Sequence, residues 1–341
     1  MKGIINQKRK NEMSICFLFP SDDILITMDR NDTLILAPLA GYTDRAFREI
    51  CSHFGSDCAV TEMVSAEGLA REGEKTILLM DRYEGEKKLT VQLFAPSKDP
   101  VERALPILKE SGIDSIDINC GCPVPKVVKT GAGSALMREP EKMGEIVRTL
   151  KDGLKIPVSV KFRLGWDSDS INYIEFAHIA VDNGADALTL HARTRAQGYE
   201  GKARKEAFGI LSKEFRGQNV SLYASGDIFS PEDAVEAIGK YGMTGVMFAR
   251  GSIGNPFIFR ETREFLSSGS YTLPTVEEKV KTALEHYDLM VKYFGERVAS
   301  HGMRKHALAY VKGIRGASTC KAALSVAAAR EDYEKAFSLL M

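Results

Sequence analysis

Eight short apolar runs, each followed by a stretch with helical spacing, constrain the fold of this chain more than any other feature. Strands that alternate with helices build a parallel sheet, and eight such repeats favour closure into a barrel. We therefore expect an α/β fold, a (β/α)8 TIM barrel. An open, doubly wound sheet is the alternative, which the similar spacing of the eight strands disfavours. The predicted strands are 34–38, 58–63, 89–94, 115–119, 158–163, 187–192, 220–226 and 245–250.

The strand pattern stops after about residue 270, and apolar residues then recur at helical spacing in 275–299, 302–314 and 320–340. This change predicts a small all-helical C-terminal domain, joined by a Ser- and Gly-containing linker. We expect three parts: a variable or disordered leader over 1–30, the barrel over 31–268, and the helical domain over 269–341.

The charges balance, with 46 basic and 46 acidic side chains in 341 residues, so nucleic acid binding would require a local patch. One such patch is predicted in the helical domain, where 297–330 contains no Asp or Glu. Its seven cations are either a solvated helix face or a contact surface for phosphates. They are Arg297, Arg304, Lys305, Lys312, Arg315, Lys321 and Arg330.

Six cysteines scattered along a long chain favour reduced thiols and a cytoplasmic protein. No apolar run is long enough to span a bilayer, so we expect no membrane association. We expect a monomer and infer no protein partner.

Polar residues gather at the predicted C-terminal strand ends, where barrel enzymes carry their working groups. Lys161 lies inside an apolar strand, and it is either half of a structural ion pair or a cation aimed at an anionic ligand. The turns at 225–227 and 250–251 follow the last two strands, where barrels bind phosphate. Together with Gln92 and His191, these features suggest a phosphorylated planar cofactor, for which FMN is suitable.

Cys120 and Cys122 are separated by one residue at the end of the fourth strand. Their spacing is poor for zinc, and a disulfide between them would be strained, so we expect no metal. One thiol could simply fill the barrel. The other, in a Gly-Cys-Pro turn, could donate a proton, because a thiol is mostly protonated at neutral pH.

Several stretches in this order resemble the tRNA-dihydrouridine synthases, most closely the bacterial B class. They are "LAPLAGYTDRAFR" (36–48), "VQLFAPSKDP" (91–100), "IDINCGCPVPKVVKTGAGSALM" (116–137), "VSVKFRLGW" (158–166), "LTLHARTRAQGYEG" (188–201), "ASGDI" (224–228), "FARGSIGNPFIFRE" (248–261) and "RKH" (304–306). The resemblance implies an FMN-bearing barrel and a helical tRNA-binding domain. It also implies reduction of the 5,6 double bond of particular tRNA uridines, with NADPH or NADH as the reductant.

The resemblance implies roles by position. Cys122 is then the acid that protonates uracil C5, while the reduced flavin delivers hydride from N5 to C6, and Cys120 is a bystander. Asn119 would help to hold the uracil and the flavin. The implied flavin contacts are Pro38, Leu39, Ala40, Gln92, Lys161, His191, Ser225, Gly226, Asp227, Ala249 and Arg250. The further substrate contacts we expect are Arg163, Arg193, Arg304, Lys305 and His306.

The sequence departs from the family pattern at Cys120 and Leu39, where Met is usual, at Ser225 for Asn, and at Ala249 for Gly. Two other functions remain alternatives. One is a flavin-dependent barrel reductase acting on a small molecule, which would not explain the acid-free basic segment. The other is a non-catalytic tRNA-binding protein, which would not require Cys122, Lys161 and His191.

Overall fold

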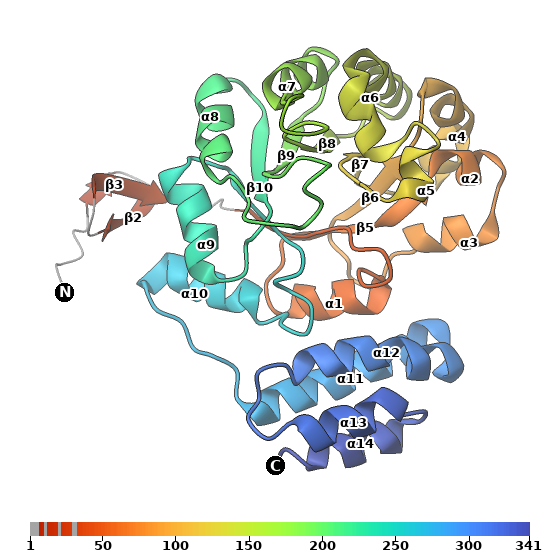
Figure 1. Ribbon diagram of the computed structural model, residues 1–341, viewed down its shortest axis with the longest axis vertical. Coiled ribbons are helices and arrows are strands. Elements are labelled where there is room, and N and C mark those ends of the chain that lie inside the picture. The colour runs from red at the N-terminus through yellow and green to blue at the C-terminus, as the bar shows by residue number, and fades with distance from the viewer. Residues whose placement is uncertain (1–6, 10–11, 20–21, 29–32) are drawn as a thin grey trace.

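The computed structural model shows a closed barrel of eight parallel strands with a helical domain beside it (Figure 1). It describes residues 7–9, 12–19, 22–28 and 33–341, with side chains from residue 33 onward. All eight predicted strands are confirmed, with ends shifted by only a few residues. The barrel strands are β4 (Thr33–Leu36), β5 (Cys58–Ser65), β6 (Leu89–Phe94), β7 (Ser115–Cys120), β8 (Val158–Arg163), β9 (Ala187–His191), β10 (Ser221–Ser225) and β11 (Gly245–Phe248).

Helices follow the strands and cover the outside of the barrel (Figure 1). Proline begins several of them; Ser230, for example, caps a helix whose first residue is Pro231. The helices of the barrel domain are α1 (Arg45–His53), α2 (Ala66–Ala70), α3 (Glu74–Ile77), η1 (Leu78–Met80), α4 (Lys98–Glu110), α5 (Pro125–Val128), η2 (Gly133–Arg138), α6 (Pro140–Leu154), α7 (Tyr173–Asp182), α8 (Glu206–Glu214), α9 (Pro231–Val235), η3 (Glu236–Lys240) and α10 (Ile258–Ser268).

The two faces of each strand have different surroundings, as the alternation of side chains along a strand requires. Outward residues such as Ile116, Ile118 and Val160 belong to one large buried apolar cluster with the helices. The inward face is apolar at β4 and β11, where Ile35 and Met247 pack together. At β6, β7 and β8 the inward side chains are instead polar, and this is where the candidate site begins.

Acidic side chains clamp the N-terminal ends of the barrel strands. Asp57, Asp114 and Asp186 each accept a hydrogen bond of 2.6–2.7 Å from a backbone N–H at the start of the neighbouring strand. Thr244 repeats the arrangement at 3.0 Å. The four backbone donors are those of Leu34, Leu89, Val158 and Leu222. These hydrogen bonds therefore connect the N-terminal ends of neighbouring barrel strands.

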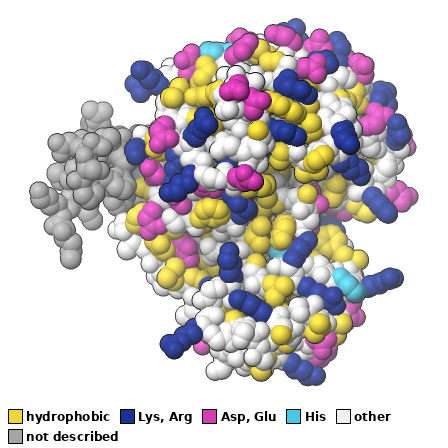
Figure 2. All heavy atoms as spheres, in the orientation of Figure 1, with side chains coloured by type: hydrophobic (Ala, Val, Ile, Leu, Met, Phe, Trp, Pro, Cys, Tyr) yellow, Lys and Arg dark blue, Asp and Glu magenta, His cyan; other side chains and the backbone are white. Residues whose placement is uncertain are grey.

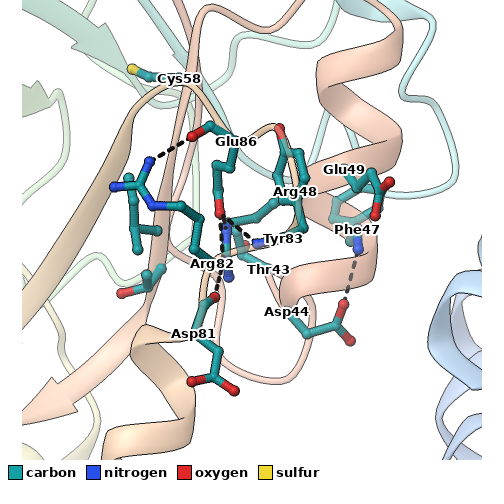
Figure 3. Close-up of polar contacts among 12 residues, drawn as sticks. Thr43, Asp44, Phe47, Arg48, Glu49, Cys58, Asp81, Arg82, Tyr83 and Glu86 are labelled. Carbon is teal, nitrogen blue, oxygen red and sulfur yellow. Dashed lines mark hydrogen bonds and ion pairs between the residues drawn. The ribbon is translucent and has the colours of Figure 1, made fainter. Parts of the chain in front are cut away.

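A buried ion pair ties α1 to the segment that precedes β6 (Figure 3). Arg48 donates from Nε to Glu86 at 2.8 Å and from Nη2 to the backbone oxygen of Asp81 at 2.6 Å. Both charged side chains are only 2% exposed. The second carboxylate oxygen of Glu86 accepts the backbone N–H of Tyr83 at 3.2 Å, so the buried charges are well bonded.

The C-terminal helical domain predicted from the sequence is present. Its helices are α11 (Val276–Phe294), α12 (Glu296–Tyr310), α13 (Ser318–Val326) and α14 (Arg330–Ser338). They share a second apolar cluster that also includes Ala46 of α1 and Phe257. The helical domain therefore packs directly against the barrel beside α1 (Figure 1).

At the N-terminus, β1 (Gln7–Arg9), β2 (Glu12–Phe19) and β3 (Asp22–Met28) pair as an antiparallel sheet. The predicted leader over 1–30 lies partly outside the described residues and stays a prediction. Within the part of the chain that the structure describes, no helix has both the length and the apolar character needed to cross a membrane.

Candidate active site

The register of the barrel strands brings the predicted polar residues level with one another at the C-terminal mouth. Asn119 on β7 lies opposite Lys161 on β8. One layer higher, His191 on β9 lies opposite Arg163 and also opposite Ser225 on β10. Residues far apart in the sequence therefore meet at one end of the barrel, as expected for an α/β barrel enzyme.

A chain of side-chain hydrogen bonds leads from the barrel interior to the Cys122 loop. Asp117 accepts a bond of 2.7 Å from Nε2 of Gln92, and Oε1 of Gln92 accepts one of 2.7 Å from Nδ2 of Asn119. Oδ1 of Asn119 then accepts the backbone N–H groups of Gly121 at 3.2 Å and Cys122 at 2.9 Å. Asn119 therefore fixes the turn that carries the cysteine.

The donor and the acceptor of each hydrogen bond in this series follow from the Cys122 loop, where the series ends. Backbone N–H groups can only donate, so the Asn119 oxygen must face the Cys122 loop. The Asn119 amide nitrogen therefore donates to the Gln92 oxygen, and the Gln92 amide nitrogen is left to donate to Asp117. Asp117 also accepts from Oγ of Ser159 at 2.6 Å. Burial raises the pKa of Asp117, while its hydrogen bonds and the charge of Lys161 favour the ionised form.

The two cysteines of the "CGC" stretch have different environments. Cys120 is fully buried in the apolar cluster between barrel and helices. Cys122 is half-buried in the loop beyond β7, and both thiols are free. Burial raises the pKa of the Cys122 thiol, which is therefore protonated at neutral pH. A hydrogen bond from the Val124 backbone and the charges of Arg163 and Lys161 act in the opposite direction and would stabilise the thiolate.

Lys161 and His191 both have unused hydrogen-bonding capacity. Nε2 of His191 is buried without a partner among the residues that the structure describes, and burial holds the pKa of this ring well below its ordinary value. Burial and the nearby Arg163 lower the pKa of Lys161 to about 8. No hydrogen bond or ion pair joins Lys161 to another described residue, so its ammonium group is available to a ligand.

The turns after β10 and β11 leave backbone donors without acceptors. In the described chain, the N–H groups of Gly226, Asp227, Arg250 and Gly251 have no hydrogen-bond partner in the protein. Asp227 holds the first turn in the left-handed region, at φ 53°, by accepting bonds from Nη2 of Arg193 at 2.6 Å and Nη2 of Arg250 at 3.1 Å. Consecutive unpaired N–H groups of this kind suit a phosphate.

Lys161, His191 and the turns after β10 and β11 line a cavity of about 70 Å³ at the barrel mouth, and Cys122 lies outside this lining. The exposed rings of Tyr199 and Phe229 belong to its lining, with the Arg250 guanidinium 4.6 Å and 5.2 Å from their centroids. Gln92, Asn119 and Ala40 lie outside its lining. The expected cofactor residues that the cavity brings together are Pro38, Leu39, Lys161, His191, Ser225, Gly226, Asp227, Ala249 and Arg250.

A larger cavity of about 780 Å³ lies at the opposite, N-terminal end of the barrel. Its three aspartates are the clamps described above, and each also pairs with a cation. Its thiol, Cys58, has its pKa raised to about 12 by burial and by Asp57. This end is therefore poorly suited to acid–base chemistry, and the smaller cavity at the C-terminal mouth is the candidate site.

Two arginines that we expected to meet substrate are largely occupied by the fold. Arg163 is 2% exposed and donates to the backbone oxygens of Gly121 at 2.6 Å and Thr194 at 2.9 Å. Arg193 is 1% exposed and bonds to Asp227 and to the backbone of Gly201. Both therefore brace the loops of the mouth, and their predicted substrate contacts stay a prediction.

The three residues of the "RKH" stretch of α12 have different environments, and only Lys305 is exposed. Arg304 is partly buried and donates to the backbone of Ala327 at 2.8 Å. Lys305 donates to the backbone oxygen of Gly41, in the loop after β4, and remains exposed. His306 is fully buried against Tyr42 and Phe47, so the expected tRNA contact does not fit its position. His306 is buried among apolar side chains where the two domains meet. The charge pattern of the sequence does not reveal this burial.

Sequence reasoning missed Asp117, Tyr199 and Phe229. Asp117 could have been predicted from the sequence. It lies two residues before Asn119 in the same strand, so both side chains must point into the barrel. The two aromatic rings follow strand ends in loops, where no periodicity applies.

The sequence of this chain is similar to those of known proteins over most of its length. The sequence profile of the family "Dihydrouridine synthase (Dus)" matches residues 35–339. The chain is 41% identical over 290 residues to a probable tRNA-dihydrouridine synthase of Treponema pallidum, covering 83% of this chain and 85% of that protein. It is 38% identical over 291 residues to probable tRNA-dihydrouridine synthase 1 of Synechocystis, covering 84% and 80%. It is 34% identical over 283 residues to tRNA-dihydrouridine synthase B of Pasteurella multocida, covering 83% and 84%.

Proposed function

Because this chain belongs to the dihydrouridine synthase family, we propose that it reduces the C5=C6 bond of specific uridines in tRNA with FMN as the hydride carrier. The reductant would be NADPH or NADH. Cys122 would donate the proton to C5, and the free hydrogen-bonding groups around the mouth would hold the cofactor. The unpaired Nε2 of His191, next to an unpaired Lys161, is the observation that carries the cofactor proposal.

The chemistry of these groups suits a flavin phosphate. The N–H groups of the turns after β10 and β11 would receive the phosphate, and Lys161 would stand near the ring system. When bound, a reduced flavin supplies a hydride to a carbon of the substrate ring. A flavin is larger than 70 Å³, so side chains that line the cavity, such as Tyr199 and Arg250, would have to change position when it binds.

The role proposed for Cys122 comes from its position in the family pattern, and a protonated thiol is compatible with it. A protonated thiol can transfer its proton to a carbon that becomes basic as hydride arrives at its neighbour. The S–H bond breaks, a C–H bond forms at C5, and the sulfur keeps the electron pair. Arg163, Lys161 and the Val124 backbone N–H then stabilise the thiolate, which regains its proton from water.

The direct test uses the purified full chain supplied with FMN, NADPH and an unmodified tRNA transcript. Dihydrouridine is measured by mass spectrometry after nuclease digestion, with free uridine as a parallel substrate. The proposal requires product from tRNA and little from free uridine. A flavin-loaded protein that reduces only the small molecule would instead identify a small-molecule reductase, and one that reduces neither would contradict the proposed reaction.

A further inference from the structure

We propose that Arg138 and Arg195, held on the indole ring of Trp166, form a contact site for the phosphate backbone of the RNA substrate. This inference rests on the proposed function and deepens it, because it places the RNA over the loops that follow β7, β8 and β9. Nothing in the charge pattern of the helical domain requires contact on this side of the mouth.

The two guanidinium groups lie on one aromatic ring. The Cζ atom of Arg138 is 3.9 Å from the Trp166 ring centroid, and that of Arg195 is 4.4 Å from it. Arg138 ends η2, Trp166 follows β8, and Arg195 follows β9. The stack therefore joins the C-terminal ends of three neighbouring units, on the same end of the barrel as Cys122.

Hydrogen bonds fix these loops to one another before any ligand arrives. Backbone N–H groups of Arg195 and Ala196 donate to the oxygens of Gly165 and Trp166, both at 2.9 Å. Nδ2 of Asn172 donates to the backbone oxygen of Met137 at 2.7 Å, which ties η2 to the loop after β8. A binding surface built on a rigid base loses less conformational freedom on association.

No acidic side chain in the described part of the chain pairs with either guanidinium group. In the described part of the chain, neither Arg138 nor Arg195 has a side-chain hydrogen bond or an ion pair. Nε of Arg195 is buried and has no partner among the described residues, which leaves only its terminal amino groups for a ligand. The acid that follows Arg138 in the sequence, Glu139, pairs with Lys142 instead.

Phosphate is the partner that this arrangement suits best. An arginine stacked on an aromatic ring keeps the N–H groups at its edge free, and their fork matches two oxygens of a phosphate. Lys126 and Lys129, both exposed in the segment between Cys122 and η2, add positive charge on the same side. RNA helices present mainly phosphates and sugars to a protein surface. These cations would therefore fix the position of the tRNA, while the site at the barrel mouth would recognise the base.

The test measures the affinity of the full-length protein for unmodified tRNA over a range of salt concentrations. Each arginine replaced by alanine should flatten the slope of log affinity against log salt by about 0.7–0.9, the value for one lost phosphate contact. At 0.1 M salt this corresponds to roughly five- to eightfold weaker binding. Trp166→Ala should weaken binding too, and Arg138→Ala should have a smaller effect in that background than in the wild type.

Arg148→Ala is the matched control, because Arg148 is exposed on α6 without an ion pair, on the outer layer of helices. Melting curves verify that each variant is folded. Slopes for Arg138→Ala and Arg195→Ala equal to that of Arg148→Ala would overturn the inference and leave the stack as a brace between loops. Binding is measured without turnover, so a wild type that makes no dihydrouridine would contradict the proposed function separately.

Discussion

The side-chain oxygen of Asn119 accepts the backbone N–H of Cys122 at 2.9 Å, and this bond sets the position of the half-buried thiol. The same amide donates to Gln92, which in turn donates to Asp117. The loop that carries the proposed acid is therefore anchored to the charged interior of the barrel. We expect the rate of reduction to depend on the bonds that Asn119 makes to the Cys122 loop as well as on Cys122 itself.

Asn119→Ala should slow the reduction of tRNA uridine roughly tenfold or more. The change leaves two backbone N–H groups without an acceptor, at a cost of about 1–3 kcal/mol for each one that stays buried. Single-turnover reduction measures the rate, and alkylation of Cys122 followed by mass spectrometry reports the freed loop. Met63→Leu is the matched control, because its sulfur accepts only a weak contact of 3.2 Å from the same Asn119 amide. Equal rates for both variants would show that the anchor is unimportant.

Gly226→Ala should weaken flavin binding roughly tenfold, because overpacking of this kind typically costs about 1–3 kcal/mol. A Cβ at Gly226 would lie 2.7 Å from Cδ2 of His191, in a backbone conformation of φ 102°. Fluorescence titration with FMN measures the affinity. Gly198→Ala also imposes a side chain at positive φ, here 56°, but meets no atom within 4 Å. If the Gly198 variant loses as much affinity as the Gly226 variant, the clash with His191 is not the cause.

Lys161 should make stability depend on pH in the alkaline range. Its pKa falls from 10.5 to about 8 on folding, so between these values the unfolded chain binds more protons than the folded one. Stability contributed by this group therefore rises as pH increases from 8 to 10.5, by at most about 3 kcal/mol. Urea unfolding of the wild type and Lys161→Met across this range should show the wild type gaining stability relative to the variant. Parallel pH profiles would mean that Lys161 titrates normally.

Breaking the Arg48–Glu86 pair should destabilise the fold by about 3–5 kcal/mol, because the remaining charge stays buried without its partner. Arg48→Met and Glu86→Leu should each lower the midpoint of urea unfolding. The double variant should lose much less than the sum of the two, since neither charge is left alone. Strict additivity of the two losses would contradict the pairing shown in Figure 3.

The barrel could be predicted from the sequence because one pattern, an apolar run followed by a stretch with helical spacing, occurs eight times. Each strand is an apolar run, and its pairing partner is the next run along the chain, so eight local predictions define the order β4 to β11. The helical domain was predictable for the same reason. The positions of Gln92, Asn119 and Lys161 near the mouth also follow from their place in each strand.

Contacts between distant loops were not predictable in this way. Nothing local shows that His306 is buried against Phe47, or that Arg138 and Arg195 share the Trp166 ring. Figure 2 shows the same difficulty for the surface, because Lys and Arg side chains occur on both the barrel and the helical domain. A cation counted in the sequence can brace a loop, as Arg163 does, or remain free, as Arg138 does.

The central claim is that the Cys122 thiol donates the proton to the reduced uracil ring. The most direct measurement compares wild type, Cys122→Ala and Cys120→Ala, each loaded with FMN and reduced before tRNA is added, and follows dihydrouridine formation in one turnover. The account predicts a loss of roughly 100-fold or more for Cys122→Ala, as expected for removal of a general acid, and near-normal product for Cys120→Ala. Near-normal product from Cys122→Ala, with tRNA still bound, would contradict it.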